Sequence, residues 1–320
     1  MTMHPHELAM EVATRVHDAV APHLGTFDAR VKVGDAPGGD ATLAIDEVAE
    51  TVVTECLRAE GDIAFYSEDQ GLVTFGSPRA ILVIDPVDGT RPAAAGLESC
   101  CVSVAVVPPN EQATLGEVSF GIVHELKTGQ RFFAEPGGGV TAQEADGSPV
   151  PVALSGNTDL DALFWTAGLR GRPSLPMTVV LEELVDRSGM RGGYFDLGSA
   201  TFNITRIVTG QLDAYVDIGR RVLDEFPETE GAFLAVGDGN VCTNFPYDVA
   251  AAALILEEAG GVITHADGRS LASHPAVGSS RAEGLAVLAA ASPELHVALL
   301  EAVDRGITHL GSWFTAARGS

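Results

Sequence analysis

Two aspartates stand three residues apart in the stretch Asp85-Pro-Val-Asp-Gly-Thr90, which ends an apolar run. Carboxylates this close repel each other unless a cation lies between them. Gly89 allows the backbone to approach a ligand, and a helix that starts near Thr90 would point free N–H groups at an anion. The stretch therefore suits a metal ion beside a phosphate, although an ordinary capped turn at the start of a helix would use the same residues.

Further acidic residues lie at the ends of other predicted elements. Glu68 and Asp69 are at the end of a predicted strand, and Asp46 and Asp248 are each near the start of a predicted helix. Carboxylate oxygens suit hard cations such as magnesium, and two such ions can activate a water and neutralise the leaving oxygen of a phosphoryl group. Taken singly, Asp46 and Asp248 are more often helix caps. Together, the acids predict a shared metal cleft.

Apolar periodicity predicts elements that place these acids at their ends. In the N-terminal half we expect helices at 5–24 and, capped by Thr42, at 45–61, a turn-rich stretch at 71–78, and strands at 63–68, 80–85, 98–107, 116–126 and 129–135. In the C-terminal half, strands at 162–168, 193–198 and 212–218 alternate with helices at 176–189, 199–211 and 247–261. Gly, Ser and Pro enrichment over 134–157 predicts a boundary near residue 155, which separates a domain of residues 1–155 from one of residues 156–320.

Composition limits the partners and the compartment. The 19 Lys and Arg against 44 Asp and Glu give a formal charge of −25, which disfavours nucleic acid because such binding needs Lys and Arg at the phosphates. The N-terminus lacks a secretory signal and no apolar run is long enough for a membrane span, so we expect a cytoplasmic protein. The four cysteines have no paired spacing and are expected to be reduced.

Three separated segments resemble the inositol monophosphatase superfamily of magnesium-dependent, lithium-sensitive sugar and inositol phosphatases. They are FYSED at 65–69, IDPVDGT at 84–90 and YDVAAAALILEEAGG at 247–261. Two weaker segments, at 39–50 and 197–217, extend the resemblance over most of residues 32–262. The resemblance implies the layered αβαβα sandwich of inositol monophosphatase and fructose-1,6-bisphosphatase, an α+β or α/β fold with two subdomains, and a homodimer.

The resemblance also implies metal ligands. Glu68, Asp85 and the carbonyl of Val87 would hold one Mg²⁺. Asp85, Asp88 and Asp248 would hold a second. A further, weaker ion near Glu68 would help to position the nucleophile, giving two or three Mg²⁺ per site, while Asp69 would lie behind these ligands.

Catalytic and substrate-binding roles follow from the same resemblance. Asp46 and Thr90 would order and deprotonate the attacking water, assisted by Glu68, while the N–H groups of Gly89 and Thr90 hold phosphate oxygens. The alcohol part of the substrate would face a group of residues around the start of a predicted helix and the end of a predicted strand, namely Asp88, Gly198, Ser199, Ala200 and Asp217. Asp217 could equally be a strand-end residue that faces solvent.

The sequence departs from the family at several places. Thirty residues, 218–247, separate Asp217 from Asp248, where relatives have a short connection, and this insertion could be a lid, a dimer contact or a specificity loop. Asp35 stands where relatives often have a lysine, with Lys32 close enough to substitute. Arg91 could reach a phosphate or a second anionic group, or it could be an exposed arginine at a helix start.

We therefore expect a magnesium-dependent phosphatase that hydrolyses an inositol or sugar monophosphate such as myo-inositol 1-phosphate. Fructose 1,6-bisphosphate is the main rival substrate, and nucleotide 3'-phosphates are less suited because no pocket for a base can be identified. A catalytically weak metal-binding or regulatory protein is the alternative from another class. Retention of the whole acidic set and Thr90 argues against it, since a decayed site should have lost at least one member.

Overall fold

The N-terminal strands form a mixed seven-stranded sheet. In the computed structural model, which describes residues 2–318, its strand order is β4-β3-β5-β6-β7-β8-β9. Strands β3 and β5 run parallel and the other neighbours run antiparallel. The strands are β3 (Ile63–Ser67), β4 (Gly71–Phe75), β5 (Ile81–Asp88), β6 (Cys101–Val107), β7 (Phe120–Glu125), β8 (Arg131–Ala134) and β9 (Val140–Gln143).

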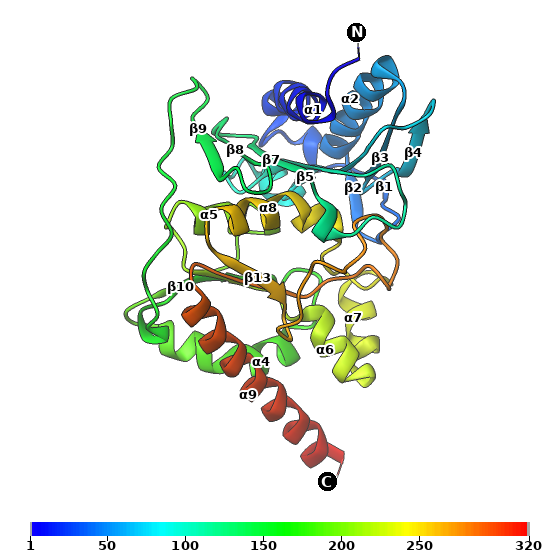
Figure 1. Ribbon diagram of the computed structural model, residues 1–320. Helices are drawn as coiled ribbons and strands as arrows, with labels where there is room; N and C mark the ends of the chain where they lie inside the picture. Colours follow the sequence, from blue (N-terminus) through cyan, green and yellow to red (C-terminus); the bar gives the residue numbers. More distant parts are fainter. Residues whose placement is uncertain (1, 319–320) are drawn as a thin grey trace.

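Two N-terminal helices cover the outer face of this sheet (Figure 1). They are α1 (Pro5–Val20) and α2 (Ala44–Glu60). The apolar residues of α1 recur every four positions, so Leu8, Val12 and Val16 lie on one face and are fully buried. They belong to a core cluster that includes alternate residues of the strands, such as Leu82 and Val102.

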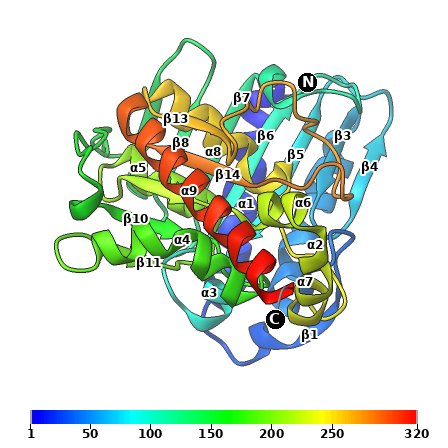
Figure 2. The same cartoon turned by 90° about the horizontal axis from the view of Figure 1, so that it is seen from below.

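The C-terminal strands form a second, five-stranded mixed sheet with the order β11-β10-β12-β14-β13. They are β10 (Phe164–Ala167), β11 (Gly193–Phe195), β12 (Ala214–Val216), β13 (Val262–His265) and β14 (Val287–Ala290). Helices α4 (Ser174–Ser188) and α9 (Pro293–Arg318) pack on its outer face, as Figure 2 shows from below. The third core cluster, around Trp165, lies between these helices and the sheet.

Helices α5 (Ala200–Val208) and α8 (Pro246–Glu258) lie between the two sheets (Figure 1). A helix covered on both sides must be apolar all round, and residues 249–256 of α8 are all buried. Its alanines permit close contact with the first sheet: a Cβ added to Gly121 would come within 2.9 Å of the backbone of Ala251. The middle layer therefore ties both sheets into one core cluster.

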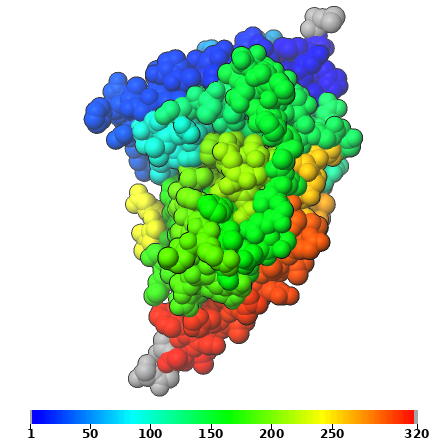
Figure 3. All heavy atoms as spheres, turned by 90° about the vertical axis from the view of Figure 1, so that its left-hand side faces the viewer, coloured from blue at the N-terminus to red at the C-terminus, as the bar shows by residue number. Residues whose placement is uncertain are grey.

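The five layers confirm the expected αβαβα sandwich with two mixed sheets. The connection between the sheets, residues 144–163, descends along one side of the molecule (Figures 1 and 3). The expected boundary near residue 155 falls within this connection, but α8 of the second half packs against the first sheet. The division into domains 1–155 and 156–320 stays a prediction.

Several local expectations are wrong. Residues 71–75 form strand β4 rather than a turn, and β9 lies inside the segment expected to be a linker. Thr42 does not cap α2; it lies in β2 (Ala41–Leu43) and its hydroxyl donates to Asp69. The reason is that the Asp46 carboxylate takes the capping place by accepting the N–H of Leu43 at 2.7 Å.

Smaller elements complete the chain. A hairpin joins β1 (Lys32–Asp35) to β2, and α3 (Thr90–Ala95) follows β5. The insertion folds into two short helices, α6 (Gly219–Glu225) and α7 (Glu230–Val236). The four cysteines, Cys56, Cys100, Cys101 and Cys242, are free thiols. Among residues 2–318, none of the helices combines the length and the apolar character needed to cross a membrane.

Candidate active site

Asp85, Asp88 and Asp248 come together at the end of β5. One carboxylate oxygen from each lies within 4.8 Å of the others. Residues three apart in a regular strand point to opposite faces of the sheet. Here the pairing with β6 shifts register between Asp85 and Asp88, so that one extra residue is accommodated. This bulge turns both carboxylates toward the same cleft, where the first turn of α8 adds Asp248.

The electrostatics of this triad favour a bound cation. Burial raises the pKa of Asp85 well above its usual value, and the charges of Glu68, Asp88 and Asp248 raise it further. Burial and the charge of Asp88 do the same for Asp248. The nearby arginines are paired elsewhere: Arg170 with Asp40, and Arg172 with Asp217. An all-oxygen donor set under mutual repulsion fits a hard divalent cation.

Glu68 and Val87 lie beside the triad. Glu68 directly follows β3 and lines the same cleft. Burial raises its pKa well above the usual value, and the charges of Asp248 and Asp46 add to the shift. The carbonyl of Val87 accepts a hydrogen bond from the Thr90 hydroxyl at 3.2 Å. Both expected ligands of the first metal ion are therefore at the cleft, next to Asp85.

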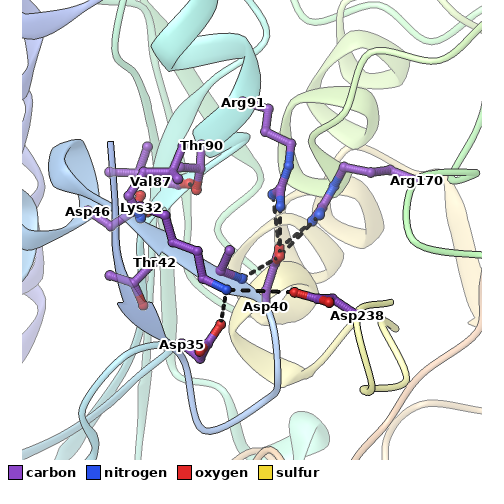
Figure 4. A network of polar contacts seen from close by, with 12 residues as sticks. Lys32, Asp35, Asp40, Thr42, Asp46, Val87, Thr90, Arg91, Arg170 and Asp238 are labelled. Atoms are coloured by element: carbon purple, nitrogen blue, oxygen red, sulfur yellow. Dashed lines mark hydrogen bonds and ion pairs between the residues drawn. The ribbon is translucent and has the colours of Figure 1, made fainter. Parts of the chain in front are cut away.

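Asp46, in the first turn of α2, lies near Val87 and Thr90 (Figure 4). Burial raises the pKa of Asp46 to about 7, although the N–H of Leu43, which donates to its carboxylate, and the neighbouring Thr90 hydroxyl oppose the shift. A carboxylate with a pKa near neutrality is suited to accept a proton as a general base. Asp46 also acts as a helix cap, because one of its carboxylate oxygens accepts the N–H of Leu43 at the start of α2. The same residue thus caps the helix and lies beside Thr90.

Gly89 has a backbone conformation that only glycine adopts readily. Its φ is +90°, and an added Cβ would lie 2.4 Å from the carbonyl oxygen of Ser99. The tight turn allows α3 to begin at Thr90 directly after the strand. The N–H groups of this turn are thereby brought to the cleft that Gly89 and Thr90 both line.

The start of α5 forms the facing wall. Gly198, Ser199 and Ala200 line the cleft, as expected. Ser199 is the N-cap of α5, where its hydroxyl accepts the N–H of Phe202 at 3.1 Å. The same hydroxyl donates to the Asp88 carboxylate at 2.8 Å. The α5 cap thus holds one member of the acidic triad in place.

Comparison with known proteins identifies this arrangement. The model of the inositol monophosphatase family matches residues 4–307. The chain belongs to this family. It is accordingly a phosphoric monoester hydrolase, with an acidic cluster able to bind metal.

Relatives with assigned activities are moderately similar. The fructose-1,6-bisphosphatase/inositol-1-monophosphatase of Methanothermobacter thermautotrophicus is 28% identical over 269 residues, covering 82% of this chain and 84% of that protein. Inositol monophosphatase 2 of Saccharomyces cerevisiae is 27% identical over 266 residues, covering 78% of this chain and 77% of that protein. The solved IMPase of Thermotoga maritima is 21% identical with a TM-score of 0.67, over 95% of this chain and 98% of that chain, and shares the fold.

Asp217 neither lines the cleft nor faces solvent, the two positions expected for it. It is fully buried, so it does not face solvent. Its carboxylate pairs with the Arg172 guanidinium and accepts the N–H of Gly219 at 2.9 Å and the Asn244 amide at 3.0 Å. Arg172 and Asn244 line the cleft in front of it. Asp217 therefore holds Arg172 and Asn244 in position without lining the cleft itself.

The insertion, residues 218–247, lies beside the cleft. Cys242, Thr243 and Asn244 at its end contribute to the cleft wall. Lys32 does not reach the phosphate region: its amine pairs with Asp35 at 2.7 Å and with Asp238 of the insertion at 3.9 Å (Figure 4). The expectation that Lys32 substitutes for the loop lysine of relatives is wrong in this structure.

Sequence reasoning missed four charged residues of the cleft, Asp40, Arg170, Arg172 and Asp196. Arg170 and Arg172 lie three and five residues after the carboxyl end of β10. In a chain with 19 Lys and Arg among 320 residues, an Arg-Gly-Arg run at a strand end was a usable signal. No comparable signal marks Asp40, because its importance depends on how the β1–β2 turn folds over the cleft.

Proposed function

We propose that this chain hydrolyses a small phosphate monoester of an inositol or a sugar in a reaction that depends on Mg²⁺. The observation that carries the proposal is the buried triad of Asp85, Asp88 and Asp248 beside the Thr90–Asp46 pair. Glu68, Asp85 and the Val87 carbonyl would hold one ion, and the triad would hold the second. When bound, the ions polarise the phosphoryl group and acidify water.

The residues of the chain prepare the nucleophile. The Thr90 hydroxyl donates its proton to the Val87 carbonyl, so its lone pairs remain available to orient a water molecule. Asp46 then accepts a proton of that water on its carboxylate as the water oxygen attacks phosphorus in line. The bond between phosphorus and the ester oxygen breaks, and the departing alkoxide takes a proton from solvent water. The N–H groups of Gly89 and Thr90 bind phosphate oxygens at the start of α3.

The facing wall determines which alcohol is accepted. Ser199, Asn203 and Asn244 line the cleft with polar groups, which suits a polyol more than an apolar alcohol. The Methanothermobacter thermautotrophicus relative is named for both fructose 1,6-bisphosphate and inositol 1-phosphate, and both remain candidates. A homodimer and a cytoplasmic location stay predictions.

A phosphate-release assay with malachite green tests the proposal. The esters are myo-inositol 1-phosphate, fructose 1,6-bisphosphate and adenosine 3',5'-bisphosphate, each with Mg²⁺ and with EDTA. We expect Mg²⁺-dependent release from the polyol and sugar esters, lost in Asp85→Asn and retained in Asp267→Asn, which changes an aspartate outside the cleft. Absence of release from every ester, in protein with an intact circular dichroism spectrum, would refute the proposal.

A further inference from the structure

Asp40 bridges two arginines at the mouth of the cleft (Figure 4). Its carboxylate accepts hydrogen bonds from the two terminal nitrogens of Arg91 at 3.2 and 3.0 Å. It also accepts hydrogen bonds from the two terminal nitrogens of Arg170 at 3.2 and 2.5 Å. One carboxylate is therefore held by two guanidinium forks that come from different layers of the molecule.

The three residues come from three separate elements. Asp40 belongs to the turn between β1 and β2, Arg91 is the second residue of α3, and Arg170 follows β10. All three line the cleft that contains the acidic triad. Arg91 also comes next in sequence to Thr90, so this cluster adjoins the phosphate-binding turn.

The charge of the cluster is incompletely balanced. Two guanidiniums and one carboxylate leave one positive charge, in a chain whose net charge is −25. Burial alone would raise the pKa of Asp40, but Arg170 and Arg91 outweigh it and hold the pKa well below its usual range. Asp40 is therefore ionised at neutral pH, and the arginines can still neutralise a group of higher charge.

A phosphate group would satisfy the two arginines better than Asp40 does. Guanidinium forks match the oxygens of phosphate and carboxylate alike. A phosphate dianion carries two charges and three terminal oxygens, whereas Asp40 offers one charge and two oxygens. The side chains of Arg91 and Arg170 are 41% and 42% exposed, so an incoming anion can reach both guanidiniums and compete with Asp40 for them.

We propose that Arg91 and Arg170 form a second anion subsite, which takes a second phosphate of the substrate, and that Asp40 occupies this subsite until substrate binds. The substrate class is then a small sugar or polyol bisphosphate. This inference rests on the proposed function, because it extends the same cleft. A merely structural role, in which Asp40 anchors the β1–β2 turn, is the rival explanation.

Fructose 1-phosphate and fructose 1,6-bisphosphate form a matched pair of probes, since they differ only in the second phosphate. The readout is the ratio of kcat/KM for the bisphosphate to kcat/KM for the monophosphate. We expect Arg170→Ala and Arg91→Ala each to lower this ratio by about 10-fold or more, the usual scale for losing a charge-assisted contact. Arg269→Ala, which removes an arginine that is 75% exposed, should leave the ratio unchanged.

Asp40→Asn tests the displacement step. It should lower KM for fructose 1,6-bisphosphate about 3-fold to 10-fold, with a smaller change for fructose 1-phosphate, because the competing charge is removed. In an Arg170→Ala background this gain should shrink, as expected for coupled residues. A ratio that is unaffected by both arginine variants, or an Asp40→Asn effect confined to the melting temperature, would overturn the subsite.

Binding measurements separate this inference from the proposed function. Fructose 1,6-bisphosphate should raise the melting temperature of the wild type more than of Arg170→Ala, whether or not the ester is hydrolysed. Failure to hydrolyse either ester would remove the proposed function and leave this difference standing. Equal shifts in both proteins, alongside normal hydrolysis, would remove the subsite alone.

Discussion

Asp88 and Ser199 join the first sheet to the middle layer at the centre of the cleft. The Oδ2 atom of Asp88, at the end of β5, accepts hydrogen bonds from the Ser199 hydroxyl at 2.8 Å and from the N–H of Thr201 at 2.6 Å. These bonds lower the pKa of Asp88, but burial outweighs them and keeps it raised. The position of one acid of the triad thus depends on the packing of α5 from the other half of the chain.

Asp88→Asn should separate activity from stability. Asparagine keeps an oxygen that can accept the bonds from Ser199 and Thr201, but it removes a charge from the triad. We expect kcat with saturating Mg²⁺ to fall by about 100-fold or more. The metal-free melting temperature should hold or rise, since repulsion among the acids is relieved.

The matched control for this experiment is Asp146→Asn, which changes an aspartate in a turn at the start of the inter-sheet connection. It should leave kcat unchanged. An Asp88→Asn enzyme with more than about a tenth of wild-type activity would contradict the placement of this carboxylate at the metal site, given the losses usual for metal ligands.

Gly89→Ala should damage the fold as well as the site. The added methyl would lie 2.4 Å from the carbonyl of Ser99, at a φ of +90°. We expect a loss of about 2–4 kcal/mol in unfolding free energy, because backbone strain and a steric clash combine. Urea denaturation measures the loss.

Gly137→Ala is the natural comparison for this variant. Gly137 also has a positive φ, +75°, but an added Cβ there meets no atom within 4 Å. Only the conformational cost remains, about 1 kcal/mol. Equal losses in the two variants would show that the close approach at Gly89 is unimportant.

The acids of the site were predictable because each has a local signature. Asp85 follows the apolar run of β5, and Asp46 and Asp248 stand in the first turns of helices, which hydrophobic periodicity marks. The bulge that turns Asp85 and Asp88 to one side was not predictable from the pattern. It depends on the pairing of β5 with β6, which is a non-local contact.

The charged residues at the rim of the cleft were less predictable, because their arrangement also depends on non-local contacts. Arg91 was recognised as a residue that could reach an anion, but its partner Asp40 lies 51 positions away in sequence. The family resemblance implied that Asp217 faces the substrate at the cleft wall, yet Arg172 lies in front of it. Which of two charged residues lies in front depends on side-chain packing, which spacing does not encode.

The stability of the metal-free protein should fall as pH rises. Burial raises the pKa of Asp46 and of Glu50 to about 7 each, above about 4 for unfolded carboxyls. Between these values the folded state holds more protons than the unfolded state. The stabilisation is present below about pH 4 and is lost as pH rises through 7, on the order of 1–3 kcal/mol per group.

Melting temperatures measured from pH 5 to pH 8 with EDTA, and again with Mg²⁺, check this. Mg²⁺ should flatten the slope, because it stabilises the ionised carboxylates of the triad. Glu50 forms hydrogen bonds with Ser67 and Gln70 away from the triad, so its contribution to the slope should persist when Mg²⁺ is present. Replacing Glu50 by Gln should remove that contribution. A metal-free melting temperature that is flat or rises over this range would contradict the raised pKa values.

Asp217→Asn distinguishes support of Arg172 from direct contact with substrate. Arg172 would lose the charge partner of a buried ion pair, so we expect unfolding free energy to fall by about 3–5 kcal/mol. Because the carboxylate lies behind Arg172, kcat/KM should change by the same factor for myo-inositol 1-phosphate and for phenyl phosphate, which has no alcohol hydroxyls. A stable variant with a defect confined to the inositol ester would instead place Asp217 on the substrate hydroxyls.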